Sequence, residues 1–133
     1  LEKKIKINSK DSRRIIKRLR KRVREWHKQD SVERWGVDIG DEVTAQLRRL
    51  SVYCGMHEQI RDVQAKEKCL KMCVEWMAEE PTVESIQGWS TFLMGQICAG
   101  NEDTYGKQCL KLGALKRIFG MMKKIDESDL QKA

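Results

Sequence analysis

The stretch that decides the fold is residues 100 to 133, GNEDTYGKQCLKLGALKRIFGMMKKIDESDLQKA. After a polar opening, it predicts an amphipathic helix over Asn101 to Leu112, a corner at Gly113 and a second helix over Leu115 to Ile125. Glycine suits the corner because it adopts left-handed backbone without a Cβ clash. The acidic run 126 to 129 supplies the capping side chains and negative charge that begin a third helix. This order is typical of one unit in a repeated helical array.

The same order resembles the armadillo repeat, in which a short first helix leads through a small-residue corner into a second helix and a longer third one. The match covers residues 82 to 133 and, less completely, 58 to 80. The resemblance implies an all-α, armadillo-like right-handed helical solenoid over 42 to 133, preceded by a loop over 31 to 41 and a basic amphipathic helix over 1 to 30. Solenoid units bury apolar surface only against neighbours, so we expect a truncated array whose C-terminal end is covered by further repeats or a partner chain.

Composition favours helices throughout the chain. Pro81 is the single proline in 133 residues, and Lys, Glu, Leu and Arg are abundant. No apolar run reaches the roughly 18 residues of a membrane span, and no charged-then-apolar signal segment opens the sequence. The odd count of five cysteines favours reduced thiols over a secreted disulfide framework. We therefore expect an intracellular protein of the cytoplasm or nucleus.

Positive charge is concentrated in residues 1 to 30, which hold 13 Lys and Arg against 4 acids, whereas the other 103 residues hold 14 against 16. A cap at Asp11 or Ser12 predicts a helix through this segment. Its apolar stripe would be a set of anchors, Ile15, Leu19, Val23 and Trp26. The opposite, basic surface would consist of Arg13, Arg14, Lys17, Arg18, Arg20, Lys21, Arg22 and Arg24.

This basic surface has several interpretations that the sequence leaves open. It is a solvated face of a packed helix, a contact for nucleic acid or a nuclear-import receptor, or a contact for a membrane surface or acidic partner. Alternatively, the anchors dock the helix in a groove of another chain. Only Trp26 and Trp35 are available for base stacking, which disfavours specific recognition of single strands.

Two further helices are predicted before the clearest repeat. One spans Asp41 to Tyr53, and the other spans Glu58 to Glu80 with a break near Val63 to Lys66. Pro81 ends the second, and Thr82 would cap the next helix.

That next helix, Val83 to Ala99, has two distinct faces. The core face is expected to comprise Val83, Ile86, Ser90, Leu93 and Ile97. The other face is a candidate partner groove made of Ser85, Trp89, Phe92 and Gln96. Alternatively, Trp89 and Phe92 are core residues between repeats. Gly88 and Gly95 are costly inside a helix and predict a neighbour pressed against them.

The armadillo resemblance assigns roles to two of these residues. Phe92 and Gln96 stand where the family has a groove tryptophan and an asparagine that binds the backbone of an extended peptide. Glutamine has the same amide on a longer arm.

Catalytic motifs are missing from the sequence, so we expect no enzyme and no cofactor. One weak zinc candidate exists, because Cys54 and His57 are followed, after eleven intervening residues, by Cys69 and Cys73. The alternative is that these cysteines are buried free thiols.

Taken together, the sequence favours a non-catalytic scaffold or adaptor that binds a segment of another protein, as a peptide or a helix, through an armadillo-like surface. The alternative is a helical nucleic-acid-binding protein whose N-terminal helix contacts phosphates.

Overall fold

The computed structural model describes residues 1–28, 37–78, 83–120 and 122–123, and within these ranges the chain is helical without strands. The prediction of an all-α fold is confirmed for this part of the chain. The helices are α1 (Glu2–His27), α2 (Val37–Met56), α3 (Glu58–Lys66), α4 (Cys69–Met77), α5 (Glu84–Gly100), the π-helix η1 (Glu102–Gly106) and α6 (Lys107–Lys111). Residues 114–120 form a further helical segment.

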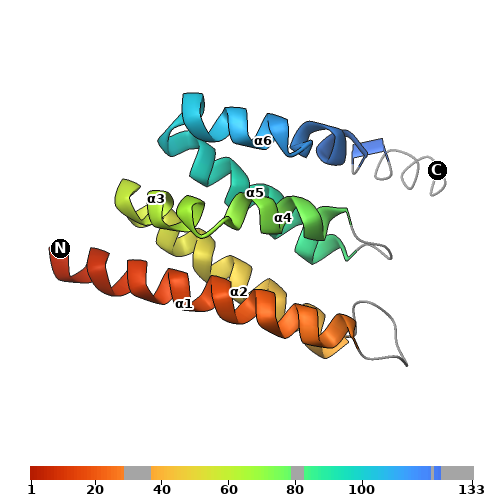
Figure 1. Ribbon diagram of the computed structural model, residues 1–133, viewed down its shortest axis with the longest axis horizontal. Helices are drawn as coiled ribbons and strands as arrows, with labels where there is room; N and C mark the ends of the chain where they lie inside the picture. Colours follow the sequence, from red (N-terminus) through yellow and green to blue (C-terminus); the bar gives the residue numbers. More distant parts are fainter. Residues whose placement is uncertain (29–36, 79–82, 121, 124–133) are drawn as a thin grey trace, which may run out of the picture.

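The helices are arranged in two layers. In Figure 1, α1, the α3–α4 run and α6 lie side by side from one edge of the molecule to the other, and α2 and α5 pass behind them. Within the layers, α1 contacts α3 and α2 contacts α5, while contacts of α1 with α2 and of α4 with α5 join the two layers. The long helices α1, α2 and α5 can therefore bury one stripe of side chains between the layers and keep their opposite sides available.

The buried stripes of α2 and α5 have the same spacing. Every residue in both stripes is at most 1 % exposed. The α2 stripe is Val43, Leu47, Leu50 and Cys54, and the α5 stripe is Ile86, Ser90, Leu93 and Ile97. Each α5 residue follows its α2 counterpart by 43 positions. The predicted core face of α5 is thus confirmed, and Val83, which precedes the first turn of α5, is half-buried.

Two sharp corners also recur along the chain. Among the described residues, positive φ occurs at Lys68, with φ of 62°, and at Gly113, with φ of 79°. Lys68 separates α3 from α4, and Gly113 separates α6 from the helical segment 114–120. The predicted glycine corner is confirmed, but the lysine corner was not foreseen, since lysine rarely adopts left-handed backbone.

The predicted start of the first helix is wrong. Instead of beginning at a cap on Asp11 or Ser12, α1 begins at Glu2. Asp11 cannot act as a cap because Arg14 and Tyr53 both donate hydrogen bonds to its carboxylate, which is 7 % exposed in the middle of α1.

Other boundaries differ by smaller amounts. The second helix, α2, begins at Val37 inside the predicted 31–41 loop, of which 31–36 lie outside the described residues. The predicted break at 63–66 falls instead at Glu67 and Lys68. The expected 101–112 helix divides into η1 and α6, with the Asn101 side chain accepting from the Thr104 N–H at 3.1 Å. Thr82 and the capping run 126–129 lie outside the described residues.

The expected close neighbour at Gly88 and Gly95 is absent from the described part of the molecule. A Cβ added at either glycine would meet nothing within 4 Å. Both positions are exposed because they lie on the side of α5 away from its buried stripe. The prediction failed because a costly helical glycine does not by itself reveal which side of the helix is packed.

Candidate interaction surfaces

The predicted groove residues lie together on the outer side of α5. Trp89 is half-buried, whereas Phe92 is 52 % exposed. Their rings meet edge to face, with centroids 5.7 Å apart and planes at 88°. Together with the neighbouring residues of α2, they form what we call the aromatic face. Its members are Thr44, Arg48 and Val52 of α2 with Ser85, Trp89, Phe92 and Gln96 of α5.

Three contacts fix how α2 lies beside α5 along this face. At one end, the Thr44 and Ser85 hydroxyls are 3.0 Å apart. One turn further along, the guanidinium carbon of Arg48 lies 5.6 Å from the centroid of the Trp89 ring, within cation–π range.

At the far end, a Cβ built on Gly55 would lie 3.6 Å from Nε2 of Gln96. All three contacts join residues 41 positions apart, so the two helices run parallel in a constant register.

Polar and apolar groups alternate along the aromatic face. Val52, one turn beyond Arg48 on α2, is 66 % exposed and is apolar. The side-chain oxygen of Gln96 is buried and has no hydrogen-bond partner among the described residues. Trp89 also packs against the edge of the core. Trp89 therefore belongs to the edge of the core, as the alternative interpretation predicts for it, whereas Phe92 lies at the surface.

On the outer side of α1, cationic side chains form a continuous line that we call the basic spine. Its members recur at helical spacing and are all exposed: Lys3, Lys6, Lys10, Lys17, Lys21, Arg24 and Lys28. Arg13, Arg14 and Arg18 flank this line and are exposed as predicted. Lys3, Lys6 and Lys10 were not among the predicted surface residues, because the cap was placed at Asp11 or Ser12 within the helix expected over 1 to 30.

Two of the predicted surface arginines are partly buried and bind the chain itself. Arg20 donates a hydrogen bond to the Lys68 carbonyl oxygen at 2.5 Å. Arg22 Nε lies 3.3 Å from Oε2 of Glu42 on α2. These two arginines therefore tie α1 to its neighbours, and the exposed remainder forms the surface available to a ligand.

The predicted anchors of α1 face inward. Ile15, Leu19 and Val23 are at most 7 % exposed, and Trp26 is half-buried against the same core. This stripe is thus occupied by the chain's own helices. A groove in another chain would have to displace that packing in order to use the anchors.

A polar cluster links α1 to α2 next to the basic spine. Tyr53 Oη donates to Asp11 Oδ2 at 2.6 Å, and Arg49 Nη2 lies 3.1 Å from the same oxygen. The hydrogen bonds from Tyr53 and Arg14 hold the pKa of Asp11 below its ordinary value, and the positive charge of Arg49 acts in the same direction. Burial together with the bond to Asp11 raises the pKa of Tyr53. The cluster joins Asp11 to Tyr53, which is 42 positions away in the sequence, so no local motif predicts it.

The weak zinc candidate does not assemble. His57 caps α3 by accepting the Gln59 N–H on Nδ1 at 3.0 Å, and Cys54, Cys69 and Cys73 are buried. Nowhere in the described ranges do three or more His, Cys, Asp or Glu side chains gather to hold a metal ion. Burial raises the pKa of Cys54 to about 12, so this thiol is protonated at neutral pH.

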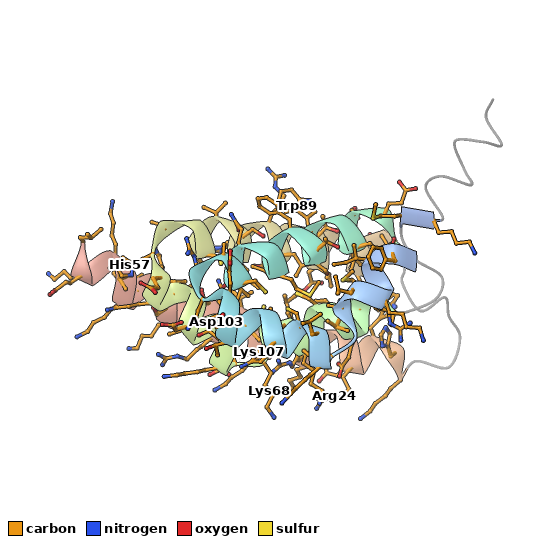
Figure 2. All side chains as sticks on the ribbon, turned by 90° about the horizontal axis from the view of Figure 1, so that it is seen from above. Arg24, His57, Lys68, Trp89, Asp103 and Lys107 are labelled. Atoms are coloured by element: carbon orange, nitrogen blue, oxygen red, sulfur yellow. The ribbon has the colours of Figure 1, made fainter. Side chains whose placement is uncertain are left out.

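Comparison with protein-family models, curated proteins and solved structures gives no match. Among the described helices, none combines the length and apolar character needed to cross a bilayer. The class defined by these findings is an all-helical chain with an aromatic face on one helix layer and a basic spine on α1. In Figure 2, Trp89 lies on the side of the molecule opposite to Arg24 and Lys68.

Proposed function

We propose that this chain is part of an armadillo-like solenoid that serves as a non-catalytic scaffold and binds an extended segment of another protein on the aromatic face. Two regularities support the repeat. The buried stripes of α2 and α5 match at an offset of 43 residues. The left-handed corners at Lys68 and Gly113 are 45 residues apart, each following a short helix. Stacked repeats produce such regular offsets because each unit packs on a copy of itself.

The observation that carries the binding proposal is the exposed ring of Phe92, which meets Trp89 edge to face. Aromatic side chains with a fixed neighbour are common binding hot spots, because they offer large apolar area at little cost in conformational entropy. Arg48 holds the other side of the Trp89 ring in place through a cation–π contact. This pair is therefore pre-organised to receive an apolar side chain.

A bound segment can also reach backbone and amide groups on α5. Gly88 and Gly95 leave open space on either side of Phe92, so a peptide can approach the helix closely. The side-chain oxygen of Gln96 is buried without a partner among the described residues, and turning this side chain outward would let the oxygen accept a hydrogen bond from a peptide N–H. An extended peptide can use the open space and the Gln96 amide together, because its side chains and N–H groups alternate in direction.

The end of the array also supports a longer assembly. Large apolar side chains on the last described helices are at least 48 % exposed, namely Leu110, Leu115, Phe119 and Met122. An exposed apolar strip of this kind is what a further repeat or a partner chain would cover. In contrast, the outer side of α1 is polar, as in helices that cap such arrays.

The test is selection from a library of extended peptides of about 12 residues, followed by calorimetric titration of the selected sequences. We expect Phe92→Ala to weaken the selected peptides at least about tenfold, because removing a hot-spot side chain typically costs 2 kcal/mol or more. Trp89→Ala should have a similar or larger effect. Circular dichroism of the two variants checks that they remain folded.

Phe119→Ala is the matched control, because Phe119 is 63 % exposed but lies on the last described helix. It should leave peptide affinity unchanged. Selected peptides that bind Phe92→Ala and the unmodified chain equally well would contradict the proposal, as would loss of affinity with the Phe119 variant alone.

A further inference from the structure

The basic spine is long and has few acidic residues beside it. Between Lys3 and Lys28 the chain contains two acids, Asp11, which is buried beside Tyr53, and Glu25, which is exposed near the end of α1. From Lys3 to Lys28 the line extends about 38 Å at the helical rise of 1.5 Å per residue. The outer surface of α1 is therefore a straight row of positive charge that meets no exposed acid between Lys3 and Arg24.

This row has an electrostatic cost in the free protein. Like charges four residues apart destabilise a helix, and Lys6 with Lys10 and Lys17 with Lys21 are such pairs. Solubility alone needs no such row, since mixed charges give it without repulsion. A ligand carrying a regular row of negative charge would remove the repulsion.

The rest of α1 favours one kind of polyanion. A helix that lies on a membrane inserts its apolar face, but Ile15, Leu19 and Val23 are buried in the protein core. Single-stranded nucleic acid is held largely by stacking on exposed aromatic rings, and the one aromatic residue of α1, Trp26, is half-buried. A duplex needs neither feature, because its phosphates form regular rows that cations can follow.

We propose that the basic spine of α1 binds the phosphate backbone of a nucleic-acid duplex without reading its base sequence. The length of the spine slightly exceeds one turn of B-form DNA, about 34 Å. Arg24 and Trp89 lie on opposite sides of the molecule (Figure 2), so a duplex on α1 leaves the aromatic face open. This binding is independent of peptide binding at Phe92.

The experiment is fluorescence anisotropy with a mixed-sequence DNA duplex of about 24 base pairs, titrated from about 50 to 200 mM salt. The variant is the triple substitution Lys10→Gln, Lys17→Gln and Lys21→Gln, which removes charge from the centre of the spine. We expect its affinity at about 100 mM salt to fall at least tenfold. The slope of log K against log salt should decrease by up to about 3, because each lost phosphate contact removes about 0.9.

A matched control removes the same charge elsewhere. Lys107, Lys111 and Lys116 are exposed on α6 and the segment after it, at the other edge of the molecule from α1 (Figure 1). Their triple replacement by Gln should change duplex affinity by less than about threefold, since it alters only the distant field. Circular dichroism verifies that both triple variants are folded.

Three results would overturn the inference. The first is no duplex binding by the unmodified chain at about 50 mM salt, and the second is an equal loss of affinity in both triple variants. The third is tighter binding of poly-glutamate or of phosphatidylserine vesicles than of the duplex, because the spine would then serve an acidic protein or a membrane surface. Each result leaves the peptide test at Phe92 unaffected.

Discussion

The helix pairs α1–α2 and α4–α5 bury residues at the same spacing on α2 and α5, but their exposed surfaces differ in chemistry. Leu50 and Leu93, 43 residues apart, are completely buried at equivalent places in the two pairs. Outside the core, however, α1–α2 carries the basic spine and the cluster around Asp11. The α4–α5 pair carries Trp89 and Phe92 instead, and α4 itself is buried over most of its length.

This difference separates what the fold requires from what a ligand can use. The inner stripes repeat because each must fit between the same two layers, and close packing tolerates little variation. The outer sides are free of that requirement and can diverge. A charged surface acts over about 10 Å and weakens with salt, whereas an aromatic surface acts at contact and is insensitive to salt. The two pairs are therefore suited to different partners.

The equivalence of the inner stripes gives the largest expected effect. Leu50→Ala and Leu93→Ala should each lower the free energy of unfolding by about 2–5 kcal/mol, because both side chains are fully buried and leave a cavity. Urea denaturation followed by circular dichroism measures the change. Val52→Ala, at a position 66 % exposed, should change stability by no more than about 0.5 kcal/mol. A large loss at one leucine and tolerance at the other would break the equivalence of α2 and α5.

Much of the inner pattern could be predicted from the sequence. The buried stripe of α5 follows from apolar spacing alone, and Gly113 marks the corner after α6 because glycine tolerates positive φ. The apolar stripe of α1 was identified correctly as well. Periodicity predicts these features because burial imposes it directly on the residue types.

The features that escaped prediction depend on contacts between distant residues. Asp11 looked like a helix cap, but Tyr53, 42 positions away, binds its carboxylate and lets α1 continue toward Glu2. Lys68 gives no local sign of a left-handed corner. Likewise, the pairing of Arg48 with Trp89 depends on the register of α2 against α5, which no single helix reveals.

The cluster around Asp11 predicts a pH dependence confined to the α1–α2 pair. Hydrogen bonds from Tyr53 and Arg14 lower the pKa of Asp11 in the folded state below the unfolded value of about 3.9. The ionised carboxylate therefore stabilises the fold fully above that value, and this contribution is lost as the pH falls through the folded pKa.

Asp11→Asn should cost about 1–2 kcal/mol of unfolding free energy at neutral pH, because a charged acceptor for Tyr53 and Arg14 is removed. The difference from the unmodified chain should shrink as the pH falls below about 4, as measured by urea denaturation across that range. Asp41→Asn, an exposed position on α2, serves as the control and should show a small, pH-independent change. A constant difference at Asp11 would mean that its role is packing rather than charge.

The smallest expected effect comes from comparing the two corners, because the same left-handed backbone is occupied by lysine in one and by glycine in the other. A Cβ in this conformation costs about 1–2 kcal/mol, while the greater freedom of glycine in the unfolded chain costs about 0.5–1 kcal/mol. Lys68→Gly should therefore stabilise the fold by up to about 1 kcal/mol, and Gly113→Ala should destabilise it by a similar amount.

Gly88→Ala is the control for the corner variants, because an added Cβ there meets nothing within 4 Å and the residue is inside α5. It should stabilise the fold by about 0.5–1 kcal/mol, opposite in sign to Gly113→Ala. Thermal and urea denaturation of the three variants give the signs. If Lys68→Gly is destabilising, the lysine side chain contributes more than its strained backbone costs, and the corners are alike in geometry but not in energy.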